Sequence, residues 1–479
     1  MRFSSVCLSL LLLYACTSVG VVSIPVGLLL TSVVSIAFIL GAALWCLRRA
    51  SRSDLLFWSF VFLLAFLPGA YLEYPADPWE HFYRIMRWST CEHVTDHPQW
   101  YKYGYFWIWS FLRWLPLESR RFGLDLISGT TQLLLCIQVY RLVLQFGLTR
   151  SFARVQAVAF FFLFGTSVFG LRYYALSSTP FAYAAYLEAL IVVLRVFAES
   201  SRKGPAVLET TILLVAMALN HVQTVFYFLL SVSVLCVVEC FLRAEARRRV
   251  QFLAAGAAVT IVGVLLGPLA IAYYPQIYQA IGLQYVSWFG SVDVTNPRWR
   301  IMNTLGVHGF VSLSFAVIFF RRFPVLAALT LAPFLTLLWP PAVALMFQVL
   351  GSGQQLYRIL YAVPTSLMLV IGFAEILRCL PIAVFRSSND SFRASLTLGL
   401  IFVAALPPAD PWGGRLYFQL YSPPAARTLQ ALDQAASWFI ERHGLRSSCR
   451  LIADQPLRFV LATHRGQRPD VNRRRPRPL

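Results

Sequence analysis

The chain has 479 residues, of which 58% are hydrophobic and only 13% are charged. Its mean hydropathy of +0.64 excludes a soluble globular protein, because a soluble chain of this length needs far more polar surface. The net charge of +20 comes without a basic and aromatic nucleic-acid-binding module, so we expect no nucleic-acid partner. The composition predicts an all-α polytopic membrane protein whose surroundings are a lipid bilayer.

Two apolar runs follow each other directly at the start of the chain. Residues 1–23 resemble a secretory signal, and a second apolar run covers 24–46. A cleaved signal and an uncleaved helical hairpin both fit this pattern, and we favour the hairpin. We therefore define 1–54 as an N-terminal hydrophobic hairpin.

Apolar runs long enough to span a bilayer recur through the rest of the chain. At roughly 20 residues a span, they predict about thirteen transmembrane helices, several of them short or interrupted by proline. The runs lie near 6–23, 25–46, 55–72, 123–145, 154–171, 180–198, 206–220, 222–242, 252–274, 304–320, 323–338, 359–377 and 394–407. We assign 55–407 to one transmembrane domain, in which 73–122 is the first large outer loop.

Arginine and lysine in the short connections predict the orientation of these helices. Sixteen arginine and lysine residues lie in six connections that the order of the spans places on the same side of the membrane. These connections are 47–54, 146–154, 199–205, 243–250, 321–322 and 378–393. By the positive-inside rule this side is cytoplasmic. The loop 73–122, the turns at 171–179 and 220–223, the stretch 339–358 and the C-terminal segment then face the outside.

The sequence changes character after residue 407. Leu429, Leu432 and Phe439 repeat at helical spacing, and short strand and helix patterns follow them. We expect 408–465 to form a small α/β extracytoplasmic segment and the basic tail 466–479 to be disordered.

The first outer loop opens with the segment YPADPWEHFYRI at 74–85. Asp77 followed by Pro78 is a helix start signal, and the aromatic residues behind it share one face. A second aromatic stretch, WYKYGYFWIWSFLRWLP, occupies 100–116. Both patterns predict interfacial helices whose aromatic side chains lie at the level of the lipid headgroups.

Asp77 is the strongest candidate for chemistry in this loop. A carboxylate beside a membrane exit is costly unless it is solvated, paired or used, and either catalysis or helix capping fits Asp77. Glu80 could share a proton or a substrate hydroxyl with Asp77. His81 could ligate a metal or make only hydrogen bonds.

Few other polar side chains lie at the predicted outer boundary. They are Arg172, His221, Gln223 and Arg358. Cations at the outer ends of apolar helices suit a phosphate whose lipid tail lies between the helices. The two arginines could instead extend to lipid headgroups, and His221 could be a hydrogen-bonded turn residue.

In their order and sidedness, these patterns resemble the glycosyltransferase C superfamily of polytopic membrane enzymes. The segments that carry the resemblance are YPADPWEHFY and HPQWYKYGYFW in the first outer loop, LRYYALSSTPFAYAAYLEAL in the next outer turn, and ALNHVQTVFYFLLSVSVL and YRILYAVPTSLMLVI further on. The resemblance covers 55–465. It implies an enzyme that transfers a sugar from a polyprenyl-phosphate carrier on the extracytoplasmic face, with a glycan, lipid or protein as acceptor.

By this resemblance, Asp77 matches the acidic catalytic position, and His221 and Arg358 match positions that bind the carrier phosphate. The stretch 177–179 departs from the family pattern, because it has two serines and a threonine where many members have an acidic residue. The resemblance also implies a bacterial inner membrane, with the active site facing the periplasm.

The expected chemistry follows from the acceptor. Its hydroxyl has too high a pKa to attack unaided, so a carboxylate must take the proton, and Asp77 is the candidate base. Charge that develops on the leaving phosphate needs cations or hydrogen-bond donors. A single displacement inverts the anomeric carbon. The nine cysteines show no zinc spacing, so no metal site is predicted, although the chemistry leaves room for a divalent cation.

Two other classes of function fit the same sequence. A transporter or flippase for a lipid-linked or anionic substrate would place polar residues in mid-membrane on broken helices, and Glu188 and Glu209 are the candidates. A non-catalytic membrane partner protein would use Asp77 only as a helix cap.

Overall fold

A computed structural model describes most of the helical part of the chain. The described residues are 3–49, 51–66, 81, 84–97, 99–162, 178–198, 203–242, 251, 254–256, 258–259, 309–336, 338, 359–360, 362–379 and 390–404. Within these ranges the chain is helical and contains no strand, which confirms the all-α prediction for this part. The predicted α/β segment 408–465 and the tail 466–479 lie outside the described residues.

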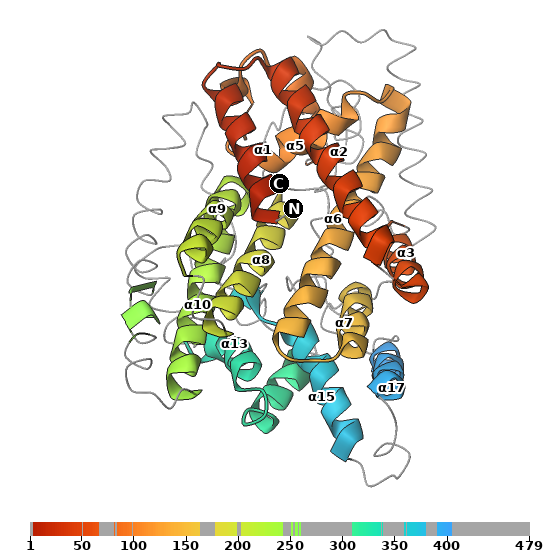
Figure 1. Ribbon diagram of the computed structural model, residues 1–479, viewed down its shortest axis with the longest axis vertical. Helices are drawn as coiled ribbons and strands as arrows, with labels where there is room; N and C mark the ends of the chain where they lie inside the picture. Colours follow the sequence, from red (N-terminus) through yellow and green to blue (C-terminus); the bar gives the residue numbers. More distant parts are fainter. Residues whose placement is uncertain are drawn as a thin grey trace, which may run out of the picture.

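The helices pack side by side as a bundle (Figure 1). Their bounds are α1 (Phe3–Ser18), α2 (Ile24–Arg49), α3 (Arg52–Phe66), α5 (Tyr103–Leu112), α6 (Leu117–Gln145), α7 (Arg150–Phe162), α8 (Thr179–Ala198), α9 (Lys203–His221), α10 (Gln223–Leu242), α13 (Pro324–Leu335), α15 (Thr365–Cys379) and α17 (Asp390–Ala404). Two 3-10 turns, η1 (Arg87–Thr90) and η2 (Val94–Asp96), precede α5. An apolar helix at Gly309–Ile318 precedes α13.

Among the described helices, five are long and apolar enough to cross a membrane, namely α2, α6, α8, α9 and α10. Four shorter apolar helices, at α1, Gly309–Ile318, α13 and α17, overlap other predicted spans. These helices are consistent with a multi-pass membrane protein. The count of thirteen spans stays a prediction, because the run near 252–274 lies largely outside the described residues.

Several helix ends follow from local sequence rules. Gly147 follows α6 with φ 77° and Gly20 follows α1 with φ 78°, and glycine adopts this left-handed conformation at little cost. Pro324 begins α13, where the missing N–H of proline leaves no hydrogen bond broken. Val222 alone separates α9 from α10.

One end of the bundle, which we call the basic end, gathers the α2–α3 turn, the α6–α7 turn, the turn before α13 and the start of α17. Arg154 of α7 pairs with Asp54 of α3, and Arg322 pairs with Glu375 of α15. A hydrogen bond of 3.2 Å also joins the first turns of α7 and α17. Basic connections that the sequence predicts to share one side of the membrane therefore lie together, at the bottom of Figure 1.

The opposite end, which we call the aromatic end, consists of α5, the α1–α2 turn and the α9–α10 turn (Figure 1). Ser32 of α2 donates a hydrogen bond of 2.6 Å to the carbonyl of Ser110, and the indole of Trp107 donates one of 2.9 Å to Ser35. The N-terminal hairpin therefore packs directly against the first outer loop.

The helix α5 is largely covered by other elements, and its predicted place at the membrane interface stays a prediction. Most of its aromatic side chains lie inside the protein, whereas Trp107 and Phe111 are half-buried. The buried ones are Tyr103, Tyr105, Phe106 and Trp109. Tyr14 of α1 packs on the rings of Tyr103 and Phe106, with centroids 5.5 and 5.1 Å away. The sequence of α5 is apolar on every side, and a helix of this kind is covered by other elements.

Two carboxylates lie within the bundle on unbroken helices. Glu188 of α8 accepts two hydrogen bonds from the guanidinium of Arg141 on α6, at 2.5 and 3.1 Å. Glu209 of α9 accepts a hydrogen bond of 2.8 Å from Ser4 of α1. Each carboxylate therefore connects two helices, and neither lies at a helix break of the kind that a transporter site would use.

Candidate functional site

The candidate site begins where α5 meets the end of α9. The backbone N–H of Gly104 donates a hydrogen bond of 2.7 Å to the side-chain oxygen of Asn220. The side-chain amide of Asn220 donates in turn to the carbonyl of Ala216, at 2.8 Å, so the acceptor is held in one orientation. A Cβ atom at position 104 would lie 2.9 Å from Asn220, from Phe181 and from the backbone of Ser178, so only glycine fits this close approach.

The start of α8 joins the same contact. The hydroxyl of Ser178 donates a hydrogen bond of 2.9 Å to the backbone carbonyl of Asn220. The three segments are distant in sequence, since Gly104 and Asn220 are 116 residues apart. The first outer loop, the start of α8 and the α9–α10 turn therefore meet at one place on the aromatic end.

His221 and Gln223 lie at this junction, on either side of Val222. The ring of His221 is half-buried, with its centroid 6.0 Å from that of the buried Tyr183 on α8. Its backbone carbonyl accepts a hydrogen bond of 2.6 Å from Thr224. Gln223 begins α10 and is also half-buried. Both side chains thus belong to the turn that Asn220 fixes against α5.

His81 reaches the junction through Tyr105. Its Nδ1 atom lies 2.7 Å from the hydroxyl of Tyr105, which is fully buried, and Arg84 donates a longer hydrogen bond of 3.5 Å to the same hydroxyl. Burial, followed by the charges of Arg84 and Lys102, lowers the pKa of His81 well below its ordinary value. His81 is therefore neutral at pH 7 and acts as a hydrogen-bonding group.

His97 holds the rest of this loop in place. Its Nδ1 accepts a hydrogen bond of 3.1 Å from the N–H of Gln99, so Nε2 carries the proton and donates to the carbonyl of Arg84 at 2.6 Å. The ring stacks on Trp88, with centroids 4.3 Å apart. Burial lowers the pKa of His97 to about 4. The neutral ring thus connects the residues before η1 to those that lead into α5.

Three of the residues that the sequence singled out are described, and these are His81, His221 and Gln223. The others lie outside the described residues, and these are Asp77, Glu80, Arg172 and Arg358. His81 and the turn that carries His221 and Gln223 each contact α5, at two adjacent positions. Tyr105 contacts His81, while Gly104 binds Asn220, the neighbour of His221.

Sequence reasoning missed the residues that make this junction. Asn220 stands in the ALNH segment beside His221, yet only the histidine attracted attention. Gly104 is the sole small residue in the aromatic run YKYGYFWIW, which is a signal of close backbone approach. Tyr105 and His97 gave no signal of their own, because a tyrosine in an aromatic helix and a histidine in a polar turn are ordinary.

The described part of the site offers imidazole nitrogens, hydroxyls, an amide and the guanidinium of Arg84. Among the described residues, no group of three or more histidine, cysteine, aspartate or glutamate side chains is placed to hold a metal ion. The described groups can therefore orient a substrate or a neighbouring catalytic group through hydrogen bonds.

Comparison of the chain with protein-family models, with curated proteins and with solved structures gives no match.

Proposed function

We propose that this protein is an integral membrane glycosyltransferase that resembles the glycosyltransferase C superfamily. It transfers a hexosyl group from a polyprenyl-phosphate carrier to a hydroxyl of a glycan, lipid or protein acceptor. The multi-pass helices support a lipid-linked donor, and the basic end supports an orientation with the aromatic end outside. In a bacterial inner membrane the site then faces the periplasm.

One observation carries this proposal, the hydrogen bond between Gly104 and Asn220. It joins the loop that contains the candidate base to the turn that contains the candidate phosphate ligand, and both groups must lie in one pocket for sugar transfer. Asp77 precedes His81 by four residues, and four residues of chain span at most about 14 Å. The contact of His81 with Tyr105 therefore supports a candidate base close to the same junction.

In the proposed mechanism, Asp77 takes the proton of the acceptor hydroxyl as that oxygen attacks the anomeric carbon. Glu80 binds the acceptor beside it. The bond between the sugar and the carrier phosphate breaks in the same step, so the anomeric configuration inverts. Arg358 and His221 stabilise the charge that develops on the leaving phosphate.

Two further predicted residues bind the donor. Arg172 binds the carrier phosphate, and Gln223 donates or accepts hydrogen bonds with the sugar. His81 orients the loop that carries the base. If the reaction uses a divalent cation, the carboxylates of Asp77 and Glu80 are the oxygen ligands that such a cation prefers.

The proposal is tested with purified full-length protein in liposomes that contain a radiolabelled polyprenyl-phosphate sugar and a soluble acceptor. Asp77→Asn keeps the ability to cap a helix but cannot accept a proton. We expect it to remain folded and inserted while sugar transfer is abolished. Asp96→Asn is the matched control, because Asp96 is an exposed carboxylate of the same loop that caps η2.

The same assay separates the other classes of function. Wild-type turnover by Asp77→Asn would remove the base assignment. Movement of the labelled lipid across the membrane without loss of its sugar would establish a transporter. Neither transfer nor movement, with any acceptor class tried, would favour a non-catalytic partner protein.

A further inference from the structure

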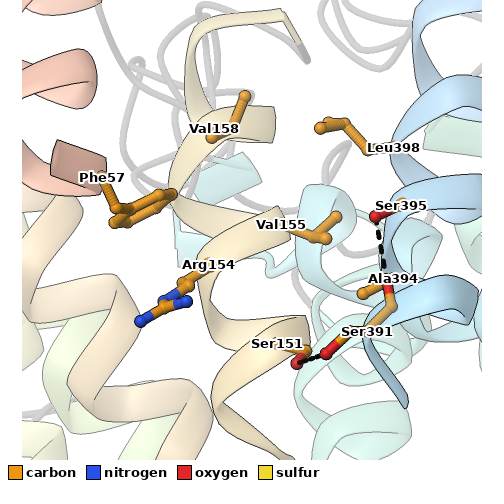
Figure 2. A pocket seen from close by; sticks show the side chains of 9 residues that line it. All are labelled: Phe57, Ser151, Arg154, Val155, Val158, Ser391, Ala394, Ser395 and Leu398. Atoms are coloured by element: carbon orange, nitrogen blue, oxygen red, sulfur yellow. Dashed lines mark hydrogen bonds between the residues drawn. The ribbon is translucent and has the colours of Figure 1, made fainter. Parts of the chain in front are cut away.

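A pocket of about 190 Å³ opens between α3, α7 and α17 at the basic end, away from the candidate site (Figure 2). Its lining residues are Phe57, Ser151, Arg154, Val155, Val158, Ser391, Ala394, Ser395 and Leu398. The proposed sugar transfer uses none of them.

The pocket is polar at one end and apolar at the other. Ser151 and Ser391 lie together at the polar end, whereas Val158 and Leu398 lie at the opposite end (Figure 2). Each serine is the second residue of its helix, and each apolar residue follows its serine by seven positions, or about 10 Å along the helix. The polar end therefore lies at the membrane boundary, and the apolar end lies deeper.

Hydroxyl groups line the polar end, and the guanidinium of Arg154 lies beside Phe57 on the α3 side of α7 (Figure 2). The hydroxyls of Ser151 and Ser391 share a hydrogen bond of 3.2 Å, and Ser395 donates one of 2.9 Å to its own helix backbone. Arg154 uses Nη2 to bind Asp54. A guanidinium has five N–H donors, so this pairing leaves donors for an anion.

The local charge favours an anionic ligand. The described side chains of the basic connections around the pocket, at 48, 51–54, 146–154 and 391–393, include five arginines and one aspartate. Arginine forms paired hydrogen bonds with phosphate oxygens, and it keeps its charge at a membrane surface. Basic clefts between transmembrane helices on this side suit the headgroups of anionic lipids.

The size of the pocket decides between a lipid and an enclosed ligand. Sites that enclose a whole small molecule have volumes of about 300–1,000 Å³, so this pocket holds only part of a ligand. A phospholipid is both anionic and only partly enclosed by such a pocket. Its phosphate fits the polar end, and its acyl chains continue into the bilayer past Val158 and Leu398. We propose that this pocket binds the headgroup of an anionic phospholipid from the leaflet at the basic end.

This lipid bridges α7 and α17, with α3 beside them. Because it binds only the folded protein, it stabilises the packing of α17 on the bundle. The proposal is independent of the sugar transfer reaction at the aromatic end.

The test is native mass spectrometry of the full-length protein in detergent, with phosphatidylglycerol and phosphatidylcholine of identical acyl chains as probes. We expect phosphatidylglycerol to remain bound and phosphatidylcholine to dissociate. Ser395→Trp fills the pocket from an exposed position, and we expect phosphatidylglycerol binding to be lost. Gly399→Trp is the matched control on the same helix, because no atom lies within 4 Å of the added Cβ, and it retains the lipid.

A second variant tests the charge without filling the pocket. Asp54→Asn combined with Arg154→Gln removes the guanidinium and its partner together, so no charge is left unpaired. We expect phosphatidylglycerol affinity to fall about tenfold, the effect of losing one hydrogen bond to a charged group, since the net charge is unchanged.

Three outcomes would overturn the proposal. They are equal retention of the two lipids, binding of phosphatidylglycerol to Ser395→Trp at wild-type strength, and displacement of the lipid by glycerol phosphate at equal concentration. If Ser395→Trp does not fold, unchanged affinity in the double variant overturns it instead.

Discussion

The two ends of the bundle are held together by different interactions. At the aromatic end most of the contacts are neutral, with histidine, tyrosine, asparagine and backbone groups that share short hydrogen bonds, and Arg84 adds a longer one to Tyr105. At the basic end, arginine and carboxylate side chains form ion pairs that remain about one-third exposed, as in the pair of Arg154 and Asp54. The difference follows burial, because a buried charge loses its hydration whereas a half-exposed pair keeps part of it.

This comparison has a consequence for function. The hydrogen bonds of the aromatic end, most of them between neutral groups, hold the loop against the α9–α10 turn, which suits the proposed sugar transfer. The exposed ion pairs of the basic end suit the proposed binding of an anionic lipid headgroup. Under these two proposals, each end of the bundle takes a different ligand.

The largest loss of folding stability is expected from the buried carboxylate of Glu188, which lies between the two ends. Arg141→Gln leaves the carboxylate of Glu188 buried without its guanidinium, and breaking a buried pair in this way costs about 3–5 kcal/mol. The measurement is the denaturant midpoint in detergent micelles. Arg141→Gln combined with Glu188→Gln leaves no charge behind and should recover most of the loss. A single variant as stable as the wild type would show that the pair carries no stability.

A pH dependence is expected from the aromatic end. Because the pKa of folded His97 is about 4, below the ordinary value of about 6.5, the unfolded chain binds this proton first. Stability is thus full above pH 6.5 and falls as the pH drops to 4, by about 3 kcal/mol at the low limit.

The variant His97→Gln isolates this contribution. Glutamine keeps one donor and one acceptor but does not titrate, so its unfolding midpoint should change less than that of the wild type between pH 6.5 and pH 4. Both proteins are followed by thermal unfolding in the same detergent. Parallel pH profiles would contradict a neutral, buried His97.

A smaller loss of folding stability is expected when the close approach of α5 to α9 is disturbed. Gly104→Ala places a Cβ against the backbone of Ser178 and against Asn220, and we expect a loss of about 1–3 kcal/mol from overpacking. Sugar transfer should fall as well, because the loop and the turn separate. Gly41→Ala in α2 meets no atom within 4 Å and should stabilise by about 0.5–1 kcal/mol. A loss of equal size in both variants would mean that the approach at Gly104 is not tight.

The smallest loss of folding stability is expected at the basic end. Asp54→Asn combined with Arg154→Gln removes a half-exposed ion pair, and such pairs contribute about 0–1 kcal/mol. The difference from the wild type should shrink further in high salt, because exposed charges are screened. Thermal unfolding in lipid-free detergent at two salt concentrations measures it. If the double variant lost more stability than Gly104→Ala, the basic end would contribute more to stability than the aromatic end, which would contradict this comparison.

Much of the fold followed from the sequence alone. Apolar runs placed α2, α6, α8, α9 and α10 within a few residues of their bounds, because a membrane span needs about 20 apolar residues in succession. The basic connections indicated which turns share a side. The surroundings of α5 could not be predicted, because aromatic side chains suit both a lipid interface and a protein interior. The helix is buried because the N-terminal hairpin packs against it.

The candidate site was also predicted only in part. His81, His221 and Gln223 stood out because ionisable and polar residues are rare in this chain. Their connection through Tyr105, Gly104 and Asn220 could not be predicted, since each of these residues is ordinary in its local sequence.

The sequence by itself determined that this is a helical, multi-pass membrane protein and which of its turns are basic. These properties depend on composition and on the local order of residues. The tertiary structure alone decided that α5 is buried, that the first outer loop meets the α9–α10 turn, and that serines from α7 and α17 line one pocket. These contacts join segments 72 or more residues apart, and such pairings depend on how whole helices pack, which no local pattern records.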